Sequence, residues 1–174
     1  GYYGIPEGGR YGEYLVIWAD GEAVGADGVY ATIGAGRTMS LNLYQFAPTN
    51  MNNIVLPDRT YKYATNKSIS TFHPAKTFCM VNDGKGNITR TDFKAGTISV
   101  KKAGSTYTIT ATLTTTDDKE FTASYTGPIT IEDKTAVKIE PLPDLENDVT
   151  NATFIRALAK YYNNDAGTAN DCVV

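Results

Sequence analysis

The chain has 174 residues, which is enough for one domain with a buried core. It carries 16 Lys and Arg against 19 Asp and Glu, a formal net charge of −3, and charged residues make up only 20% of it. Nucleic-acid binding needs a strongly basic face, so this composition argues against a nucleic-acid partner. The sequence also lacks an uninterrupted run of about 18 apolar residues, the length that a membrane-spanning helix requires.

The first half of the chain is predicted to form short strands separated by turn residues. Residues 13–18 are an almost continuous apolar run, which predicts a strand buried on both faces. In residues 38–46, Met39, Leu41 and Leu43 alternate with polar side chains, so this strand has one apolar face. Asp20-Gly21 and Asp27-Gly28 indicate a loop. Further short strands are predicted over residues 29–33, 53–56, 60–64, 68–72 and 77–81.

The second half carries the clearest strand pattern, in residues 96–131. Apolar side chains alternate with threonines over 106–114, and after the turn at 117–119 a returning strand over 121–126 ends at Gly127-Pro128. The turn at 82–86 (NDGKG) is the strongest hairpin signal. Together these segments predict an all-β fold, an antiparallel β-sandwich or barrel of about ten short strands.

The composition changes at Pro141, where the sequence PLPD predicts a linker, so the β-domain is expected to cover residues 1–140. Apolar residues from Phe154 to Tyr162 recur at helical spacing, which predicts one short helix near 150–160, with a strand as the alternative.

Residues 161–174 resemble residues 2–16. Both segments open with Tyr-Tyr, contain glycine and end with an acidic residue followed by apolar ones. We therefore expect residues 141–174 to be a linker plus the start of a second repeat copy. Coincidence in a tyrosine-rich chain is the alternative.

Few residues suggest catalysis or metal binding. His73 is the only histidine and is expected to be a loop residue, because no nucleophile motif accompanies it. Cys79 and Cys172 are expected to be small buried strand residues, with a disulfide between them as the alternative. The acidic residues at 83–87 and 117–118 lack the spacing of a calcium loop and are interpreted as plain turns. We expect no metal and no cofactor.

Aromatic residues are the most suggestive feature for function. The chain has 12 tyrosines, six phenylalanines and one tryptophan, many of them near asparagine or aspartate. Exposed rings can stack on sugar faces while neighbouring amides bind hydroxyl groups, whereas core or edge packing is the alternative for any tyrosine. The candidate ligand-binding residues are Tyr2, Tyr3, Tyr11, Tyr44, Tyr61 and Tyr63.

Four segments carry a resemblance to a known group of proteins: 56–61 (LPDRTY), 96–100 (GTISV), 107–110 (YTIT) and 125–129 (YTGPI). With them, residues 2–131 resemble uncharacterised exported β-rich lipoprotein modules of gut Bacteroidetes. Arg59 stands where that turn usually has glycine. The resemblance implies export and attachment to the outer membrane or cell surface through an upstream lipid anchor, and it implies no catalytic residue.

These observations predict that the protein is a non-enzymatic cell-surface module that binds a polysaccharide or a surface protein. Three alternatives remain open. The first is a structural or adhesin spacer. The second is a glycoside hydrolase, which would need two carboxylates about 5–10 Å apart. The third is a lipocalin-like carrier, which would need a deep apolar cavity.

Overall fold

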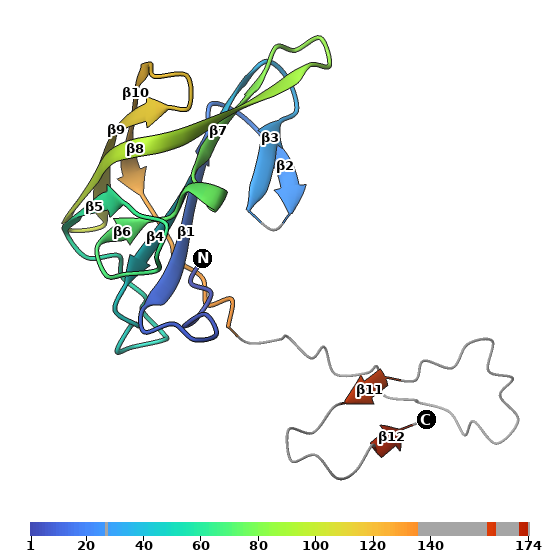
Figure 1. Ribbon diagram of the computed structural model, residues 1–174, viewed down its shortest axis with the longest axis vertical. Helices are drawn as coiled ribbons and strands as arrows, with labels where there is room; N and C mark the ends of the chain where they lie inside the picture. Colours follow the sequence, from blue (N-terminus) through green and yellow to red (C-terminus); the bar gives the residue numbers. More distant parts are fainter. Residues whose placement is uncertain (27, 136–159, 163–170, 174) are drawn as a thin grey trace, which may run out of the picture. The chain divides into compact units, whose positions relative to one another are not determined.

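The computed structural model describes residues 1–26, 28–135, 160–162 and 171–173 (Figure 1). The chain forms two compact units, Gly1–Val137 and Lys138–Val174. In the described part, regular structure consists of strands and one 3-10 turn, η1 (Pro74–Lys76), which confirms the all-β class. None of the described residues forms a helix long and apolar enough to cross a membrane. The helix predicted near 150–160 lies outside the described residues, except that Lys160 begins a strand.

The first unit contains ten strands, close to the number that the sequence predicts. They are β1 (Gly12–Ala19), β2 (Ala23–Ala26), β3 (Val29–Thr32), β4 (Gly36–Gln45), β5 (Arg59–Tyr63), β6 (Thr71–Phe72), β7 (Phe78–Asn82), β8 (Ile88–Ala103), β9 (Thr106–Thr115) and β10 (Glu120–Pro128).

Five of these strands close a barrel. The pairings run from β4 to β6, β5, β8 and β7 and back to β4. All are antiparallel except β5 with β6. β1 extends the sheet from β4, while β9 and β10 extend it from β8 (Figure 1). Of the two predicted architectures, the ring of pairings therefore matches the barrel.

β8 is the strand that turns the corner of the barrel. Its first part pairs with β7, and its second part lies between β5 and β9. A β-bulge interrupts its register with β9 between Phe93 and Ala95, and bulges of this kind bend a strand. Gly96 follows with φ of 128°, and a Cβ there would lie 2.4 Å from the carbonyl oxygen of Thr112. Only glycine fits this close approach of two backbones.

The core fills the inside of the barrel and the face of β9 and β10 that packs on it. The alternation predicted for residues 106–114 is confirmed: the apolar side chains of β9 are buried, and the threonines at 106, 108, 110 and 112 are exposed. The largest fully buried side chains include Tyr14, Tyr61, Phe72, Phe93, Ile98 and Ile109.

Three parts of the strand prediction are wrong. The strand predicted over residues 68–72 covers only β6, because residues 69–70 form a turn. Residues 53–56 form no strand, although Ile54 and Leu56 are buried. The Leu56 N–H donates to the side-chain Oη of Tyr107 at 3.3 Å instead of to a neighbouring strand. The predicted loop between Asp20 and Gly28 contains β2, which forms a separate two-stranded sheet with β3.

The second unit contains β11 (Lys160–Tyr162) and β12 (Asp171–Val173), which pair antiparallel with Tyr161 opposite Cys172. In the first unit, an isolated antiparallel bridge places Tyr2 opposite Tyr14. The predicted alignment of residues 2–16 with 161–174 places Tyr2 over Tyr161 and Tyr14 over Cys172, so the aligned residues pair in the same way in both units. The register supports the repeat, which stays a prediction.

Candidate functional site

Three of the six candidate tyrosines lie in the core. Tyr2, Tyr44 and Tyr61 are buried, so the expectation that their rings are exposed is wrong for them. Burial raises the pKa of Tyr44 and of Tyr61 to about 12, because desolvation disfavours the phenolate. Neighbouring side chains cover these rings, which therefore offer no face on which a sugar could stack.

The other three candidates reach the surface at separate places. Tyr3 is 41% exposed, and Tyr63 packs edge-on against Phe72 at the margin of the core. The ring of Tyr11 packs edge-on against that of Phe46, with 5.7 Å between the centroids. Because Phe46 is itself 59% exposed, Tyr11 is the candidate that belongs to an accessible aromatic pair.

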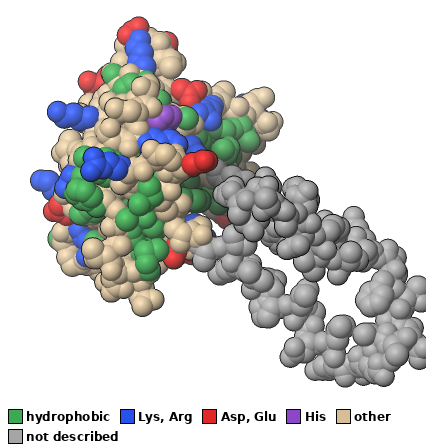
Figure 2. All heavy atoms as spheres, turned by 60° about the horizontal axis from the view of Figure 1, so that its bottom comes forward, with side chains coloured by type: hydrophobic (Ala, Val, Ile, Leu, Met, Phe, Trp, Pro, Cys, Tyr) green, Lys and Arg blue, Asp and Glu red, His purple; other side chains and the backbone are tan. Residues whose placement is uncertain are grey.

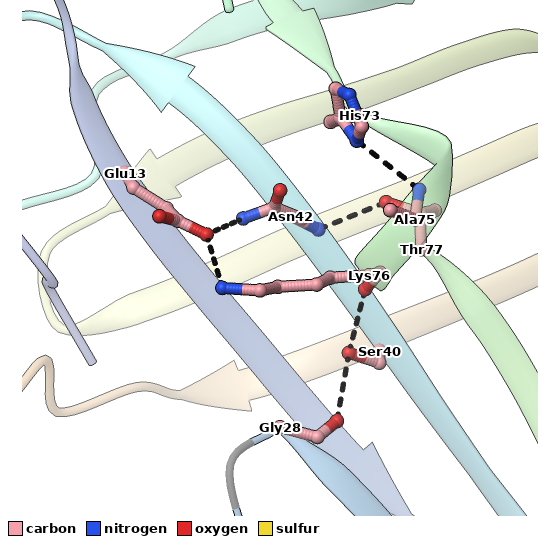
Figure 3. A network of polar contacts seen from close by, with 8 residues as sticks. All are labelled: Glu13, Gly28, Ser40, Asn42, His73, Ala75, Lys76 and Thr77. Carbon is pink, nitrogen blue, oxygen red and sulfur yellow. Dashed lines mark hydrogen bonds and ion pairs between the residues drawn. The ribbon is translucent and has the colours of Figure 1, made fainter. Parts of the chain in front are cut away.

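A polar network covers the outer face of β4 (Figure 3). Glu13 Oε1 accepts hydrogen bonds from Asn42 Nδ2 and from Lys76 Nζ, each at 2.8 Å. The backbone N–H of Asn42 donates to Thr77 Oγ1 at 3.0 Å, and the Asn42 carbonyl accepts from the His73 N–H. These bonds fasten η1 onto β4 in the gap between β6 and β7, so the network is a structural element of the fold.

His73 caps η1, and among the described residues its imidazole forms no hydrogen bond with a hydroxyl or thiol group. Its Nδ1 accepts the backbone N–H of Ala75 at 3.2 Å (Figure 3). The hydroxyl of Ser40, in the same network, donates to the carbonyl of Lys76 at 3.0 Å. Nucleophile activation would require the imidazole and the hydroxyl to bind each other. His73 lies between β6 and η1, outside both elements, which confirms its interpretation as a loop residue.

The aspartates Asp83 and Asp117 in the two predicted turns also have hydrogen-bond partners within the protein. The Asp83 carboxylate accepts from the Asn87 side chain and from two backbone N–H groups of its own turn, which lowers its pKa. Bonds from Lys119 and Thr115 lower the pKa of Asp117 to about 2. Within the described ranges, no three His, Cys, Asp or Glu side chains are arranged to hold a metal ion. Cys79 is a buried free thiol, and the side chain of Cys172 lies outside the description.

The surface feature that combines several ligand-binding groups is a hollow of about 490 Å³ beside residues 46–57, here called the loop hollow. The ends of β1, β4 and β5 and the 46–57 loop surround it. This volume is in the range of about 300–1,000 Å³ that is common for small-molecule sites. Its lining includes Gln45, Phe46, Asn50, Asn53 and Arg59.

Phe46 is held rigidly at the rim of the loop hollow. Its backbone N–H donates to Gln45 Oε1 at 2.8 Å, and its carbonyl accepts from Tyr14 Oη at 3.0 Å. Farther along the loop, the buried side chains of Ile54 and Leu56 attach the chain to the core. An exposed ring on a fixed backbone is preorganised for contact with a ligand.

The polar groups that line the loop hollow include several amides, hydroxyl groups and one cation. Asn50 and Asn53 present side-chain amides, and Arg59 is the only charged residue in the described lining. Gln45 Nε2 and Tyr61 Oη are buried without a hydrogen-bond partner in the described part, although Gln45 offsets part of the burial-driven rise of the Tyr61 pKa. The two groups lie close together but miss hydrogen-bond geometry, so both are buried without a partner in the described part of the chain.

Sequence reasoning did not identify Phe46, Arg59 or the asparagines as site residues. Phe46 closed a predicted strand, and Arg59 was noticed only as the residue that replaces a usual turn glycine. The signal that was available is the stretch from Pro48 to Pro57, in which three asparagines and two prolines separate two strands. Loops of this length between rigid strands often carry function.

Two further hollows lie beside β1. β1 and β10 are the two end strands of the sheet, and the outer edge of β10 pairs with no described strand. A hollow of about 340 Å³ lies between β1 and the segment 129–132 that follows β10. Another of about 240 Å³ lies along the seam between β1 and β10. The rings of Trp18 and Tyr125 meet across it, with centroids 5.9 Å apart. The seam is therefore partly closed by side chains, while the backbone edge of β10 stays open.

Comparison with protein-family models, with curated proteins and with solved structures finds no match to this chain. Any function therefore has to be argued from the geometry of the sites described above.

Proposed function

We propose that the chain is a non-enzymatic, exported cell-surface module that binds glycan in the loop hollow. The observation that carries this proposal is the presence, in one hollow, of an exposed aromatic ring together with several side-chain amides and a guanidinium group. Sugar rings pack their C–H faces on aromatic rings, and their hydroxyl groups bind amide donors and acceptors. On the face shown in Figure 2, charged side chains are scattered over a mostly uncharged surface. This low charge density and the resemblance to exported lipoprotein modules support the cell-surface setting.

Two of the alternatives fit the described sites less well. A glycoside hydrolase needs two carboxylates beside the substrate, and the described lining of the loop hollow contains none. A lipocalin-like carrier needs an open barrel interior, whereas side chains such as Leu41, Phe72 and Ile98 fill this one.

The Phe46→Ala variant tests the proposal. Calorimetric titration of the full chain with a panel of plant and host oligosaccharides should detect binding, and Phe46→Ala should weaken it about tenfold, the loss expected for a stacked ring. Phe46 is largely exposed, so the variant should keep its melting temperature. Ile88→Ala is the matched control, because Ile88 is 50% exposed and does not line the hollow. Absence of binding at millimolar sugar would rule out the glycan version.

A protein partner is the second candidate, and the unpaired outer edge of β10 favours it. Exposed strand edges can accept a strand from another polypeptide. If the partner is a second copy of the chain, sedimentation should reveal a concentration-dependent dimer. A lysine on an edge strand discourages such pairing, so Ser124→Lys, at an exposed position of β10, should weaken the dimer. A monomer at every concentration would argue against this version.

A further inference from the structure

We propose that the ligand of the loop hollow is an acidic glycan, and that Arg59 binds its carboxylate. This inference rests on the proposed function, because it names the class of sugar that the same hollow accepts. It starts from the charge of Arg59 and from the absence of any acidic side chain in the described lining of the hollow.

Arg59 forms no ion pair with any described residue, in contrast to Arg37 and Arg90. The guanidinium of Arg37 pairs with Asp20 at 2.9 Å, and that of Arg90 pairs with Asp92 at 2.7 Å. Arg59 Nη1 instead donates to a neutral hydroxyl, Ser70 Oγ, at 2.8 Å. A cation that lines a hollow without a counter-charge attracts anions to that hollow.

The bond to Ser70 also fixes the orientation of the guanidinium. Ser70 adopts φ of 59°, a conformation that non-glycine residues seldom take, and Arg59 itself begins β5 in register with Val100 of β8. One Nη of Arg59 is thereby occupied, while no described residue accepts from its Nε or from its other Nη. These two nitrogens form the fork that binds both oxygens of a carboxylate in a planar, bidentate pair.

The rest of the lining favours a sugar acid over a bare anion. A small inorganic anion would use Arg59 alone, whereas a uronic acid would place its ring near Phe46 and its hydroxyl groups near Asn50 and Asn53. The carboxylate then meets Arg59, and no described acidic side chain of the hollow repels it.

The experiment compares two forms of one oligosaccharide, oligogalacturonate and its methyl ester, by calorimetry with the full chain. The ester keeps the sugar backbone and removes the charge. We expect the acid to bind at least about tenfold more tightly than the ester, since a charge-assisted bidentate pair discriminates by this much. Arg59→Gln should abolish the difference by weakening the acid alone, and Arg59→Lys should restore only part of it. Lys62→Gln, the same charge change at an exposed β5 residue outside the hollow, should leave the difference intact.

The outcomes separate the two proposals. Equal binding of acid and ester, with Phe46→Ala still harmful, overturns the acidic ligand and leaves glycan binding standing. Failure of both forms to bind, while other sugars of the panel do bind, also overturns it. Failure of every sugar overturns both proposals. Binding of an oligoglutamate peptide as tight as that of the acid would show that the site selects charge and not sugar, which also contradicts the inference.

Discussion

β4 and β9 have the same alternation of apolar and polar residues but different environments. The apolar side chains of both strands enter the core. The threonines at 106, 108, 110 and 112 of β9 face solvent, whereas the outer face of β4 is buried beneath η1 and neighbouring segments (Thr38, Ser40, Asn42 and Tyr44). Burying a polar group without a hydrogen-bond partner costs free energy. The outer face of β4 therefore depends on hydrogen bonds within the protein, whereas water satisfies the exposed hydroxyl groups of β9.

The largest loss of stability is expected at Gly96 in β8, the strand that pairs with β9. A Cβ there would lie 2.4 Å from the Thr112 carbonyl oxygen and 2.7 Å from the Leu113 Cα, so β8 and β9 would have to separate. Gly96→Ala should lower the free energy of unfolding by about 4 kcal/mol, which urea denaturation measures. Gly104→Ala, at a glycine whose Cβ would meet nothing within 4 Å, is the control and should cost much less. Similar losses in both variants would mean that the close approach is unimportant.

Asn42→Ala tests the buried network directly. It removes the amide that donates to Glu13 and leaves that partly buried carboxylate with Lys76 alone, so stability should fall by about 2–3 kcal/mol. Thr110→Ala in β9 removes an exposed hydroxyl and should change stability by less than about 0.5 kcal/mol. Thermal melts of the two variants side by side measure the contrast. Equal shifts would contradict the distinction drawn between the two strands.

The buried tyrosines predict a loss of stability in alkali. Burial raises the pKa of Tyr44 and of Tyr61 from 10.0 to about 12, so above pH 10 the unfolded chain releases protons that the folded chain retains. Stability is therefore fully present below pH 10 and falls as the pH rises toward 12, by about 1 kcal/mol per tyrosine at pH 11. Denaturation at pH 8 and pH 11 checks this. Tyr44→Phe should reduce the slope, and an unchanged slope would mean that Tyr44 ionises normally in the fold.

The smallest predicted change in stability is a gain, and it concerns Thr38. Thr38 Oγ1 is buried on β4 without a hydrogen-bond partner in the described part of the chain. Thr38→Val keeps the shape and removes the unsatisfied hydroxyl, so stability should rise by about 0.5–1 kcal/mol. Ser40→Ala on the same face removes a bonded hydroxyl and should destabilise. Destabilisation by Thr38→Val as well would contradict the conclusion that Thr38 Oγ1 has no hydrogen-bond partner.

The sequence by itself determined the all-β class and most of the strands, because alternation with period two and turn residues are local signals. The hairpin of β7 and β8 shows this well, since the strand predicted over 77–81 and the NDGKG turn at 82–86 indicated it. The repeat of residues 2–16 in 161–174 stays a prediction, with which the pairing of Tyr2 with Tyr14 and of Tyr161 with Cys172 agrees.

Tertiary structure decided which polar faces are buried and where a binding hollow forms. Tyr44 and Tyr61 have the same local pattern as surface tyrosines, but segments distant in sequence cover them, and local alternation carries no information on that covering. Arg59 becomes part of the loop hollow only because β5 places it next to Ser70 and the 46–57 loop. The physical reason is that strand patterns depend on near neighbours, whereas barrel closure, burial and charge pairing depend on contacts between residues far apart in the chain.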